Sequence, residues 1–398
     1  MKPVDKPDLQ TSKPAVSVIT IVKNNEELLP RAIDSVIKQN FTDLEYIIVN
    51  DGSTDGTGGV IDAYAEKDSR IRPQHMPQNI GRAMARNTGL DNATGDYIFF
   101  LDADDYLPPT ALDDLYTVAR KDNADKVFGR IRAFDPSTGS WLHTHYTDQL
   151  ITPEKHGFKL DDQLTFVWDH SIFGRLYRHD FLRANNIRFS TERRNAEDVL
   201  FAFYTTFYAD KLSTIPQKTV YFYSIGNYLA TANESKIFDA RDNILETINF
   251  SRENGSEALK ASMLRKGLSF VSNLIRVQKV YDMKVIEYIQ SLTPFIKNVP
   301  NEMLNELPLY PKQFAMALAA NDFEGAFQAW NQEKERGKMS RKKSSDGSKA
   351  GDQALYEMEE KNHALAIQLD ELYSSLSWRV TRPLRFFHKL FSRFKKVQ

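Results

Sequence analysis

The feature that most constrains this fold is an alternation of apolar strand-like segments and helical repeats between residues 15 and 105. "AVSVITIV", "LEYIIVN" and "DYIFFL" are short runs of β-branched and aromatic residues, as in strands that are buried on both faces. Between the first two runs, apolar residues recur at helical spacing, at Leu29, Ala32, Ile33, Val36 and Ile37. Strands that alternate with helices predict an α/β fold with a mostly parallel sheet, right-handed crossovers and helices on both faces.

Polar residues follow each of these predicted strands. "KNNE" follows the first strand, Asp51 follows the second, and Asp102, Asp104 and Asp105 follow a later one. In open α/β sheets, ligands bind at the carboxyl ends of the strands. We therefore expect the ligand site at this edge of the sheet.

The segment "DYIFFLDADDYLPP" carries three aspartates directly after an apolar run. Like charges so close together repel unless a cation lies among them. Asp102 and Asp104 form an Asp-x-Asp pair whose oxygens suit Mg²⁺ or Mn²⁺. A plainer interpretation is an acidic turn, with an Asp that caps the helix starting near Pro108.

Phosphate binding by a glycine-rich loop is not predicted. "NDGSTDGTGG" is rich in glycine, but its spacing fits neither the P-loop nor the dinucleotide-binding pattern. A divalent metal is the expected holder of a diphosphate, because it would also neutralise charge on a departing nucleotide.

Length and composition suggest a chain of several domains with no membrane-spanning segment. The chain has 398 residues, 41% of them hydrophobic, and no cysteine, which excludes disulfides and thiolate metal sites. No run of 18 apolar residues occurs, so we expect a soluble, cytoplasmic protein.

Changes in pattern divide the chain into six segments. We expect a disordered lead-in at 1–14, an α/β domain at 15–234, an α-helical domain at 235–333, a charged linker at 334–352, a short coiled coil at 353–376 and a basic amphipathic tail at 377–398.

The two C-terminal segments predict partners. Apolar residues at spacings of three and four in 353–376, with Asn362 at an a position, favour a homo-oligomer, although the helix could instead dock on its own domain. In 377–398, Lys and Arg alternate with Trp, Leu and Phe, which favours an anionic membrane surface. A nucleic-acid patch and a solvated cationic tail are the alternatives, and we expect no nucleic-acid partner.

Three separated segments resemble a known family in its order of motifs. "VSVITIVKNNEELLPRAIDSVIKQNFTDLEYIIVNDGSTDGT", "NIGRAMARNTGLDNATGDYIFFLDADD" and "NAEDVLF" are similar to the family 2 inverting glycosyltransferases of the GT-A fold. The resemblance covers roughly residues 15–225 and implies a Rossmann-like GT-A domain. The short "SWRVTRPLR" stretch looks like tails on bacterial enzymes that build O-antigen or capsule chains.

The resemblance implies roles for individual residues. The nucleotide-sugar donor would be bound by Thr20, Val22, Asn24, Asp51, Asp102 and Ala103, with a weaker assignment for Arg86 and Asn87. A divalent metal, Mn²⁺ or Mg²⁺, would be held by Asp104 and Asp102.

The "NAEDVLF" segment implies the catalytic base. Asp198 would take the proton of the acceptor hydroxyl, while Glu197, Trp168 and His170 would be candidates for contact with the acceptor. The alternative is a helix whose acidic first turn only complements the helix dipole.

Together these features predict a metal-dependent inverting glycosyltransferase. It would move a sugar from a nucleotide-sugar, with UDP before dTDP and GDP, to a glycan or lipid-linked glycan at the inner face of the cell membrane. A nucleotidyltransferase would need a glycine-rich loop after the first strand, and "TIVKNNEELL" has no glycine. The remaining alternative is a non-catalytic, transferase-like scaffold in a polysaccharide assembly complex.

Overall fold

The computed structural model describes residues 13–135, 140–141, 150–224, 234–263, 266–267, 316–317, 320, 322 and 325. Contacts divide the chain into two compact units. The first consists of residues 1–160 and 169–225, and the second of residues 161–168 and 226–398. The candidate catalytic and metal-binding residues all lie in the first unit.

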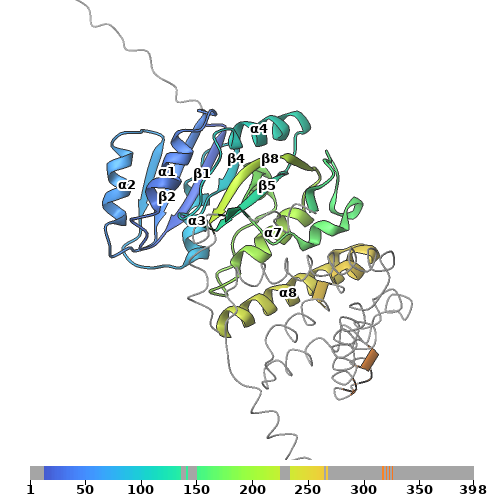
Figure 1. Ribbon diagram of the computed structural model, residues 1–398. Coiled ribbons are helices and arrows are strands. Elements are labelled where there is room, and N and C mark those ends of the chain that lie inside the picture. Colours follow the sequence, from blue (N-terminus) through green and yellow to red (C-terminus); the bar gives the residue numbers. More distant parts are fainter. Residues whose placement is uncertain are drawn as a thin grey trace, which may run out of the picture. The chain divides into compact units, whose positions relative to one another are not determined.

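The first unit is built on one eight-stranded sheet, with the strand order β3-β2-β1-β4-β7-β5-β6 and β8 paired with β5. Its strands are β1 (Val16–Val22), β2 (Leu44–Asn50), β3 (Ile71–His75), β4 (Tyr97–Phe100), β5 (Lys126–Asp135), β6 (Ser140–Trp141), β7 (Arg175–Arg178) and β8 (Leu212–Ser224). Figure 1 shows this sheet at the centre of the unit.

The sheet is parallel in its N-terminal half and mixed beyond it. β1 pairs in parallel with β2 and β4, and β2 with β3. β7 runs antiparallel to both β4 and β5, whereas β8 is parallel to β5. The expected parallel strands are confirmed for β1, β2 and β4, whereas β3 and the antiparallel β7 were not predicted.

The helices of the first unit connect these strands. They are α1 (Leu29–Ile37), α2 (Thr57–Ala65), α3 (Arg82–Asn92), α4 (Ala111–Asp122), α6 (His179–Ala184) and α7 (Glu197–Phe207). Two short 3₁₀ turns, η1 (Leu160–Asp162) and η2 (Leu164–Trp168), precede β7.

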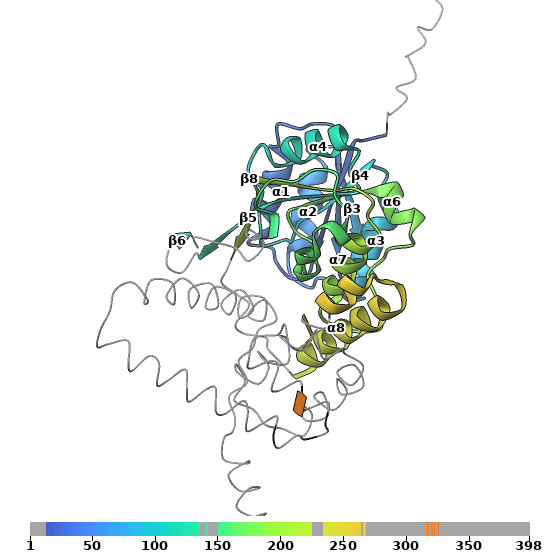
Figure 2. The ribbon, with the colours of Figure 1, turned by 90° about the vertical axis from the view of Figure 1, so that its right-hand side faces the viewer.

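Helices cover both faces of the sheet, as the sequence predicts. On one face, Val18 and Phe99 belong to the same apolar core as Ile33 of α1 and Leu115 of α4. On the other face, α3 packs so closely that a Cβ at Gly89 would lie 2.4 Å from Cγ2 of Ile19. Phe100 meets Phe201 of α7 edge to face on that side, with ring centroids 5.5 Å apart. Figure 2 shows α4 and α7 from a second direction.

Local chemistry sets the ends of α4. Its first turn contains Asp113 and Asp114 and its last turn Arg120 and Lys121, an arrangement that complements the helix dipole. Asn123 ends it in the left-handed conformation, with φ of 49°. The helix begins at Ala111, three residues beyond Pro108, where the sequence predicts its start.

In the second unit, the described part consists mainly of α8 (Glu234–Asn254), which agrees with a helix at the start of the expected 235–333 domain. The linker at 334–352, the coiled coil at 353–376 and the tail at 377–398 lie outside the described residues. Within the described part, no helix is both long and apolar enough to span a membrane.

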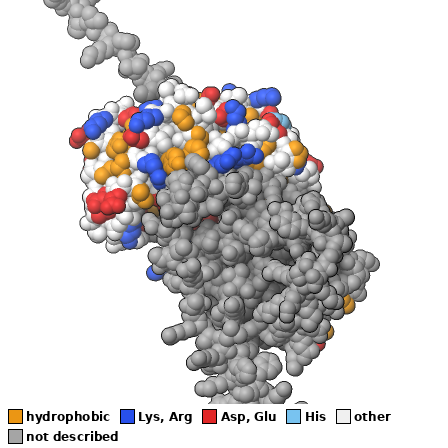
Figure 3. Space-filling view, in the orientation of Figure 1, with side chains coloured by type: hydrophobic (Ala, Val, Ile, Leu, Met, Phe, Trp, Pro, Cys, Tyr) orange, Lys and Arg blue, Asp and Glu red, His pale blue; other side chains and the backbone are white. Residues whose placement is uncertain are grey.

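The visible surface of the first unit is chemically mixed. In Figure 3, basic, acidic and hydrophobic side chains are interspersed over the coloured atoms. The surface visible in this view therefore does not mark a functional site by its charge.

Candidate functional site

Loops from distant parts of the chain meet at the carboxyl ends of β1, β2 and β4. Because β1 is hydrogen-bonded to both other strands, the residues that follow all three come together at one edge. The N-terminal ends of α3 and α7 complete the site, through Arg86 and Glu197.

The three aspartates after β4 form a cluster of carboxylates. One oxygen each of Asp102, Asp104 and Asp105 lie within 4.8 Å of one another. Burial is the main cause that raises the pKa of Asp104 to about 6, and the charge of Asp102 adds to it. Burial also raises the pKa of Asp102, against the opposing charges of Arg86 and Arg82, and burial together with the charges of Asp104 and Asp102 raises the pKa of Asp105. A cation would relieve the repulsion between these carboxylates.

The available oxygens fit a divalent metal at Asp104 and Asp102. Asp105 is 1% exposed, and its two oxygens accept hydrogen bonds from the Tyr221 hydroxyl at 2.6 Å and the Ser224 backbone N–H at 2.8 Å. Asp102 has one oxygen paired with Arg86 at 3.2 Å. No other side chain among the described residues donates to the Asp104 carboxylate, so Asp104 is the most open ligand of the three.

Arg31 of α1 fixes the aspartate turn from outside. Its guanidinium donates to the backbone oxygen of Asp104 and, at 2.9 Å, to the Ser224 hydroxyl at the end of β8. The same guanidinium lies 4.7 Å from the centre of the Tyr106 ring. This contact places a cation beside the proposed metal ligands and ties the turn to β8.

Arg86 joins the aspartate turn to the acidic end of α7. Its guanidinium donates to Glu197 and to Asp102, and its side chain is 4% exposed. Arg82 also pairs with Glu197, at 3.1 Å. Two aromatic rings, Phe173 and Phe189, lie 5.8 Å and 5.4 Å from the guanidinium. The aspartate turn and the N-terminal end of α7 are thus joined by one network of ion pairs.

Asp198 lies beside this network, at the second residue of α7. It is partly exposed, whereas Glu197 is 2% exposed. Burial raises the pKa of Asp198 to about 6 and the charge of Glu197 adds to the rise, while Arg86 and Arg82 oppose it. A carboxylate with a pKa close to neutral is suited to accept a proton.

The first two loops are joined by their polar side chains. Asp51 is 5% exposed and accepts hydrogen bonds from the backbone N–H groups of Ile80 at 2.6 Å and Gly81 at 3.2 Å. Asn24 accepts a hydrogen bond from the Thr54 N–H at 2.8 Å. Gly52 has a φ of +65° and lies so close to Gln78 that a Cβ would clash with its backbone. Asp51 and Asn24 therefore order the loops around the expected nucleoside position.

Two residues predicted to bind the donor, Thr20 and Asn87, have buried side chains that form hydrogen bonds within the protein. Thr20 is fully buried, and its hydroxyl donates to Leu101 O at 2.8 Å and pairs with the Tyr46 hydroxyl at 3.0 Å. Asn87 exchanges two hydrogen bonds with the backbone of Phe189, at 2.9 and 3.0 Å. These side chains are therefore bonded within the protein, and their contact with a donor stays a prediction.

Val22 and Ala103 contribute through the backbone and through packing. Val22 is 3% exposed, and its carbonyl accepts the Asp51 N–H at 2.8 Å. Ala103 is 7% exposed. Both lie next to the polar residues of the site and help to place them.

The predicted acceptor residues differ in their surroundings. Glu197, next to Asp198 in the chain, is buried and pairs with Arg82 and Arg86, and its contact with an acceptor stays a prediction. His170 is 6% exposed, so it offers little surface. Trp168 ends η2 in the second unit, and its role stays a prediction.

Sequence reasoning gave no role to Arg31, Arg82, Tyr221 and Phe189. Asp105 stood in the quoted aspartate run, whereas Arg31 and Ser224 are 193 residues apart and carry no shared local signal. The contact between Arg31 and Ser224 could be found only from the folded structure or from a resemblance to a known fold.

One family model matches part of this domain. Residues 17–183 match the model described as Glycosyl transferase family 2. The matched range includes the aspartate turn, Asp51 and Arg86, and it ends before Glu197 and Asp198.

Individual relatives carry related names. The chain is 29% identical over 252 residues to the putative glycosyltransferase EpsH of Bacillus subtilis, which covers 61% of this chain and 70% of EpsH. It is 33% identical over 194 residues to TarP of Staphylococcus aureus, named a poly(ribitol-phosphate) beta-N-acetylglucosaminyltransferase, which covers 47% of this chain and 55% of TarP.

A solved structure shows the same fold. TarS 1-349 of S. aureus matches with a TM-score of 0.65 and 21% identity, over 80% of this chain and 91% of TarS 1-349. TarS has also been solved with UDP-GlcNAc, and that structure matches with a TM-score of 0.66 and 20% identity. The α/β domain thus has a fold seen in a protein that binds a nucleotide-sugar.

Proposed function

We propose, from the Glycosyl transferase family 2 match at residues 17–183, that this chain is a metal-dependent inverting glycosyltransferase. It would transfer a sugar from a nucleotide-sugar to a hydroxyl group of a bacterial surface polymer. The observation that carries the proposal is the Arg86 bridge, which brings the Asp102 turn and the Glu197–Asp198 end of α7 to one edge of the sheet.

Donor binding would use the open side of the aspartate turn. Asp104 and Asp102 would hold a divalent metal, which would supply positive charge for the diphosphate and its departure. Asp51 and the loop around Asn24 would meet the base and ribose. TarS with bound UDP and with UDP-GlcNAc supports UDP as the first nucleotide to test.

Asp198 would act as the general base in a single displacement. Its carboxylate accepts the proton of the acceptor hydroxyl while the acceptor oxygen bonds to the anomeric carbon. The bond from that carbon to the donor phosphate oxygen breaks, and its electron pair leaves with the nucleoside diphosphate. One base is sufficient, and inversion follows because the oxygen attacks opposite the leaving group.

Names of relatives support the polymer as an acceptor. TarP and a Bacillus spizizenii relative are both named for poly(ribitol-phosphate), and both names specify β-linked sugars. Inversion of an α-linked nucleotide-sugar gives a β linkage. A surface polymer, either a polyol phosphate or a lipid-linked glycan, is therefore the proposed acceptor class.

Attachment at the membrane and assembly into oligomers belong to the same proposal. The basic tail at 377–398 would hold the enzyme on the anionic inner face of the cell membrane, where lipid-linked acceptors are found. Residues 353–376 would associate as a short coiled coil.

The proposal is tested by thermal shift of the full chain with UDP, dTDP or GDP, each with and without Mn²⁺. We expect a stabilisation by UDP that requires the metal and disappears in Asp104→Asn. Release of UDP from UDP-sugars, measured with purified surface polymer as acceptor, tests the transfer step. Absence of any nucleotide shift would instead favour the non-catalytic scaffold.

A further inference from the structure

A cavity lies away from the aspartate turn, at the C-terminal end of α3. Its volume is about 320 Å³, and it is lined by residues of α3, α6 and the segment that follows α6. Arg86 and Arg82 lie toward the N-terminal end of α3, whereas Leu90, Asp91 and Ala93 line this cavity. The nucleotide-sugar site does not account for it. Its volume falls at the lower end of the range for pockets that bind small molecules.

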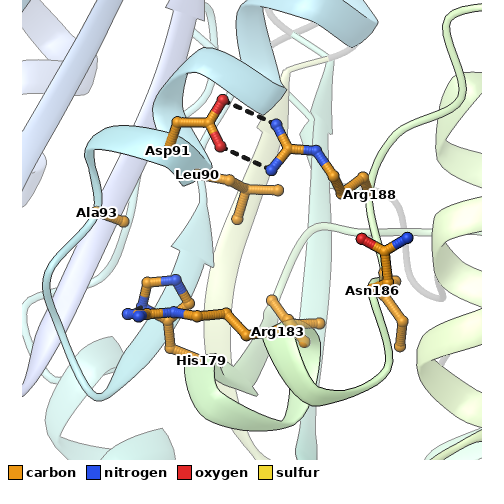
Figure 4. A pocket seen from close by; sticks show the side chains of 9 residues that line it. Leu90, Asp91, Ala93, His179, Arg183, Asn186 and Arg188 are labelled. Carbon is orange, nitrogen blue, oxygen red and sulfur yellow. Dashed lines mark hydrogen bonds and ion pairs between the residues drawn. The ribbon is translucent and has the colours of Figure 1, made fainter.

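The floor of the cavity is apolar and its mouth is charged. Leu90, Leu182 and Ile187 are at most 7% exposed. At the mouth, Arg188 and Asp91 form a two-pronged ion pair with N–O distances of 2.6 and 2.8 Å, as Figure 4 shows. This pair satisfies Asp91, so the aspartate adds no unbalanced negative charge.

Arg183 is exposed and supplies a positive charge at the cavity wall. Within the described part of the chain, no carboxylate forms an ion pair with it. Figure 4 shows its side chain extending toward His179. Its Nη2 lies 3.2 Å from Nδ1 of His179. An anion in the cavity would give this guanidinium the partner that the protein does not supply.

His179 presents one ring nitrogen without a partner. Its Nδ1 lies 2.9 Å from the carbonyl oxygen of Gly95 and 3.2 Å from Nη2 of Arg183, so Nδ1 can donate to the first or accept from the second. Burial is the main cause that lowers the pKa of His179, the hydrogen bond with Gly95 opposes it, and the charge of Arg183 adds to it. Among the described residues none forms a hydrogen bond with Nε2, and His179 is 3% exposed.

Backbone hydrogen bonds hold the segment after α6 that lines the cavity. After α6, the Ile187 N–H donates to Leu182 O at 2.9 Å and the Asn186 N–H to Arg183 O at 3.1 Å. Asn186 adopts the left-handed conformation, with φ of 50°. These bonds end the helix and leave the Asn186 amide at the cavity wall.

From these contacts we infer that the cavity is a binding site for a small anion that also carries a hydroxyl group, such as a sugar phosphate or a polyol phosphate. The phosphate pairs with Arg183, and the Asn186 amide donates a further hydrogen bond. A hydroxyl of the same ligand, which can donate or accept, forms a hydrogen bond with Nε2 of His179. The apolar floor packs against the carbon chain.

Isothermal titration of the full chain tests this site, with glycerol 3-phosphate, inorganic phosphate and glycerol as probes and with EDTA to remove divalent metal. We expect glycerol 3-phosphate to bind and to bind at least about tenfold more tightly than either other probe, because only it offers both groups. The ring of Phe189, which follows the residues of the cavity, lies 5.4 Å from the guanidinium of Arg86 in the proposed transfer site. A change at the cavity could therefore alter sugar transfer, so the experiment measures binding directly.

Variants locate the site. Arg183→Ala should weaken binding at least about tenfold, because a charge-assisted hydrogen bond is lost. Asn186→Gly, which keeps the left-handed backbone, should weaken it severalfold. Arg120→Ala on α4 removes an exposed arginine elsewhere and should leave binding unchanged.

Four results would overturn the inference. Absence of binding by glycerol 3-phosphate excludes the site, and equal binding of inorganic phosphate excludes the hydroxyl contact with His179. Unchanged binding in Arg183→Ala, or displacement of the probe by UDP with Mn²⁺, would place the ligand elsewhere. None of these results depends on whether the chain transfers a sugar.

Discussion

Arg86 and Glu197 form an ion pair whose side chains are 4% and 2% exposed, between α3 and α7. Burial acts against the charge of Arg86, but Glu197, Asp102 and Asp198 together raise its pKa, so it is a permanent cation. One buried charge therefore positions both acidic motifs of the site. The predictions below begin from this pair.

Arg86→Met should destabilise the protein by about 3–5 kcal/mol, because it leaves the buried Glu197 charge with Arg82 alone. Transfer should also fall, since Asp102 loses its contact with α7. Urea unfolding and UDP release measure the two effects.

Arg82→Met is the matched control, because it removes the other arginine from the same carboxylate. Arg82 is 47% exposed, so its loss should cost at most about 1 kcal/mol. Equal losses in the two variants would contradict the assignment of Arg86 as the main partner.

Asp198→Asn should keep donor binding and lose transfer, because the amide cannot accept the acceptor proton. We expect kcat to fall by roughly 10²–10⁴-fold while the Kd for UDP with Mn²⁺ stays unchanged. Steady-state kinetics and nucleotide titration measure these quantities separately.

Asp104→Asn serves as the comparison, since it should remove metal-dependent UDP binding itself. A similar loss of UDP binding in both variants would show that the proposed division between base and metal ligand is incorrect.

Activity should depend on the ionisation of Asp198, whose pKa is raised to about 6 mainly by burial. The base acts only when deprotonated, so kcat at saturating donor should fall about tenfold per pH unit below about pH 6 and level off above it. A kcat profile that stays flat from about pH 5 to about pH 8 would rule out Asp198 as the base.

Stability gives an independent check on the same group. The pKa of Asp198 in the folded protein lies above the ordinary value of 3.8, so folding favours the neutral acid. The stability that Asp198 contributes is therefore fully present below pH 3.8 and is lost as the pH rises through about 6. Asp198→Asn should therefore increase Tm relative to the native chain more at neutral pH than at about pH 4.

Arg31→Ala should loosen the aspartate turn, because Arg31 holds Asp104 O and the Ser224 hydroxyl. The apparent affinity for Mn²⁺ in UDP binding should fall by roughly 10-fold, in the range for residues that support metal ligands. Arg31→Lys should recover part of the loss, whereas Arg120→Ala should have no effect. Unchanged metal affinity in Arg31→Ala would exclude the supporting role.

A chain ending at Asp352 should lose binding to vesicles that contain anionic lipid, because residues 377–398 carry the predicted basic anchor. Vesicle co-sedimentation with and without anionic lipid measures this. Metal-dependent UDP binding should be retained and serves as the control for folding. Full vesicle binding by the shortened chain would show that the anchor lies elsewhere.

The sequence predicted much of the N-terminal half of the domain. β1, β2 and β4 lie where the apolar runs are, and α1 covers the sheet with the residues that recur at helical spacing. Strand and helix periodicity are properties of neighbouring residues, so they can be read locally. The antiparallel β7 escaped prediction, because pairing direction depends on how distant segments meet.

The sequence by itself determined the alternating strands and helices and the order of acidic motifs that mark the edge with Asp51, Asp102 and Asp104. Only the tertiary structure decided which polar groups face one another. It paired the Thr20 hydroxyl with Leu101 O and Glu197 with Arg86, and it joined Arg31 to the aspartate turn. A buried charge is tolerated only beside its partner, and that partner can lie more than a hundred residues away in the chain, as Glu197 does from Arg86.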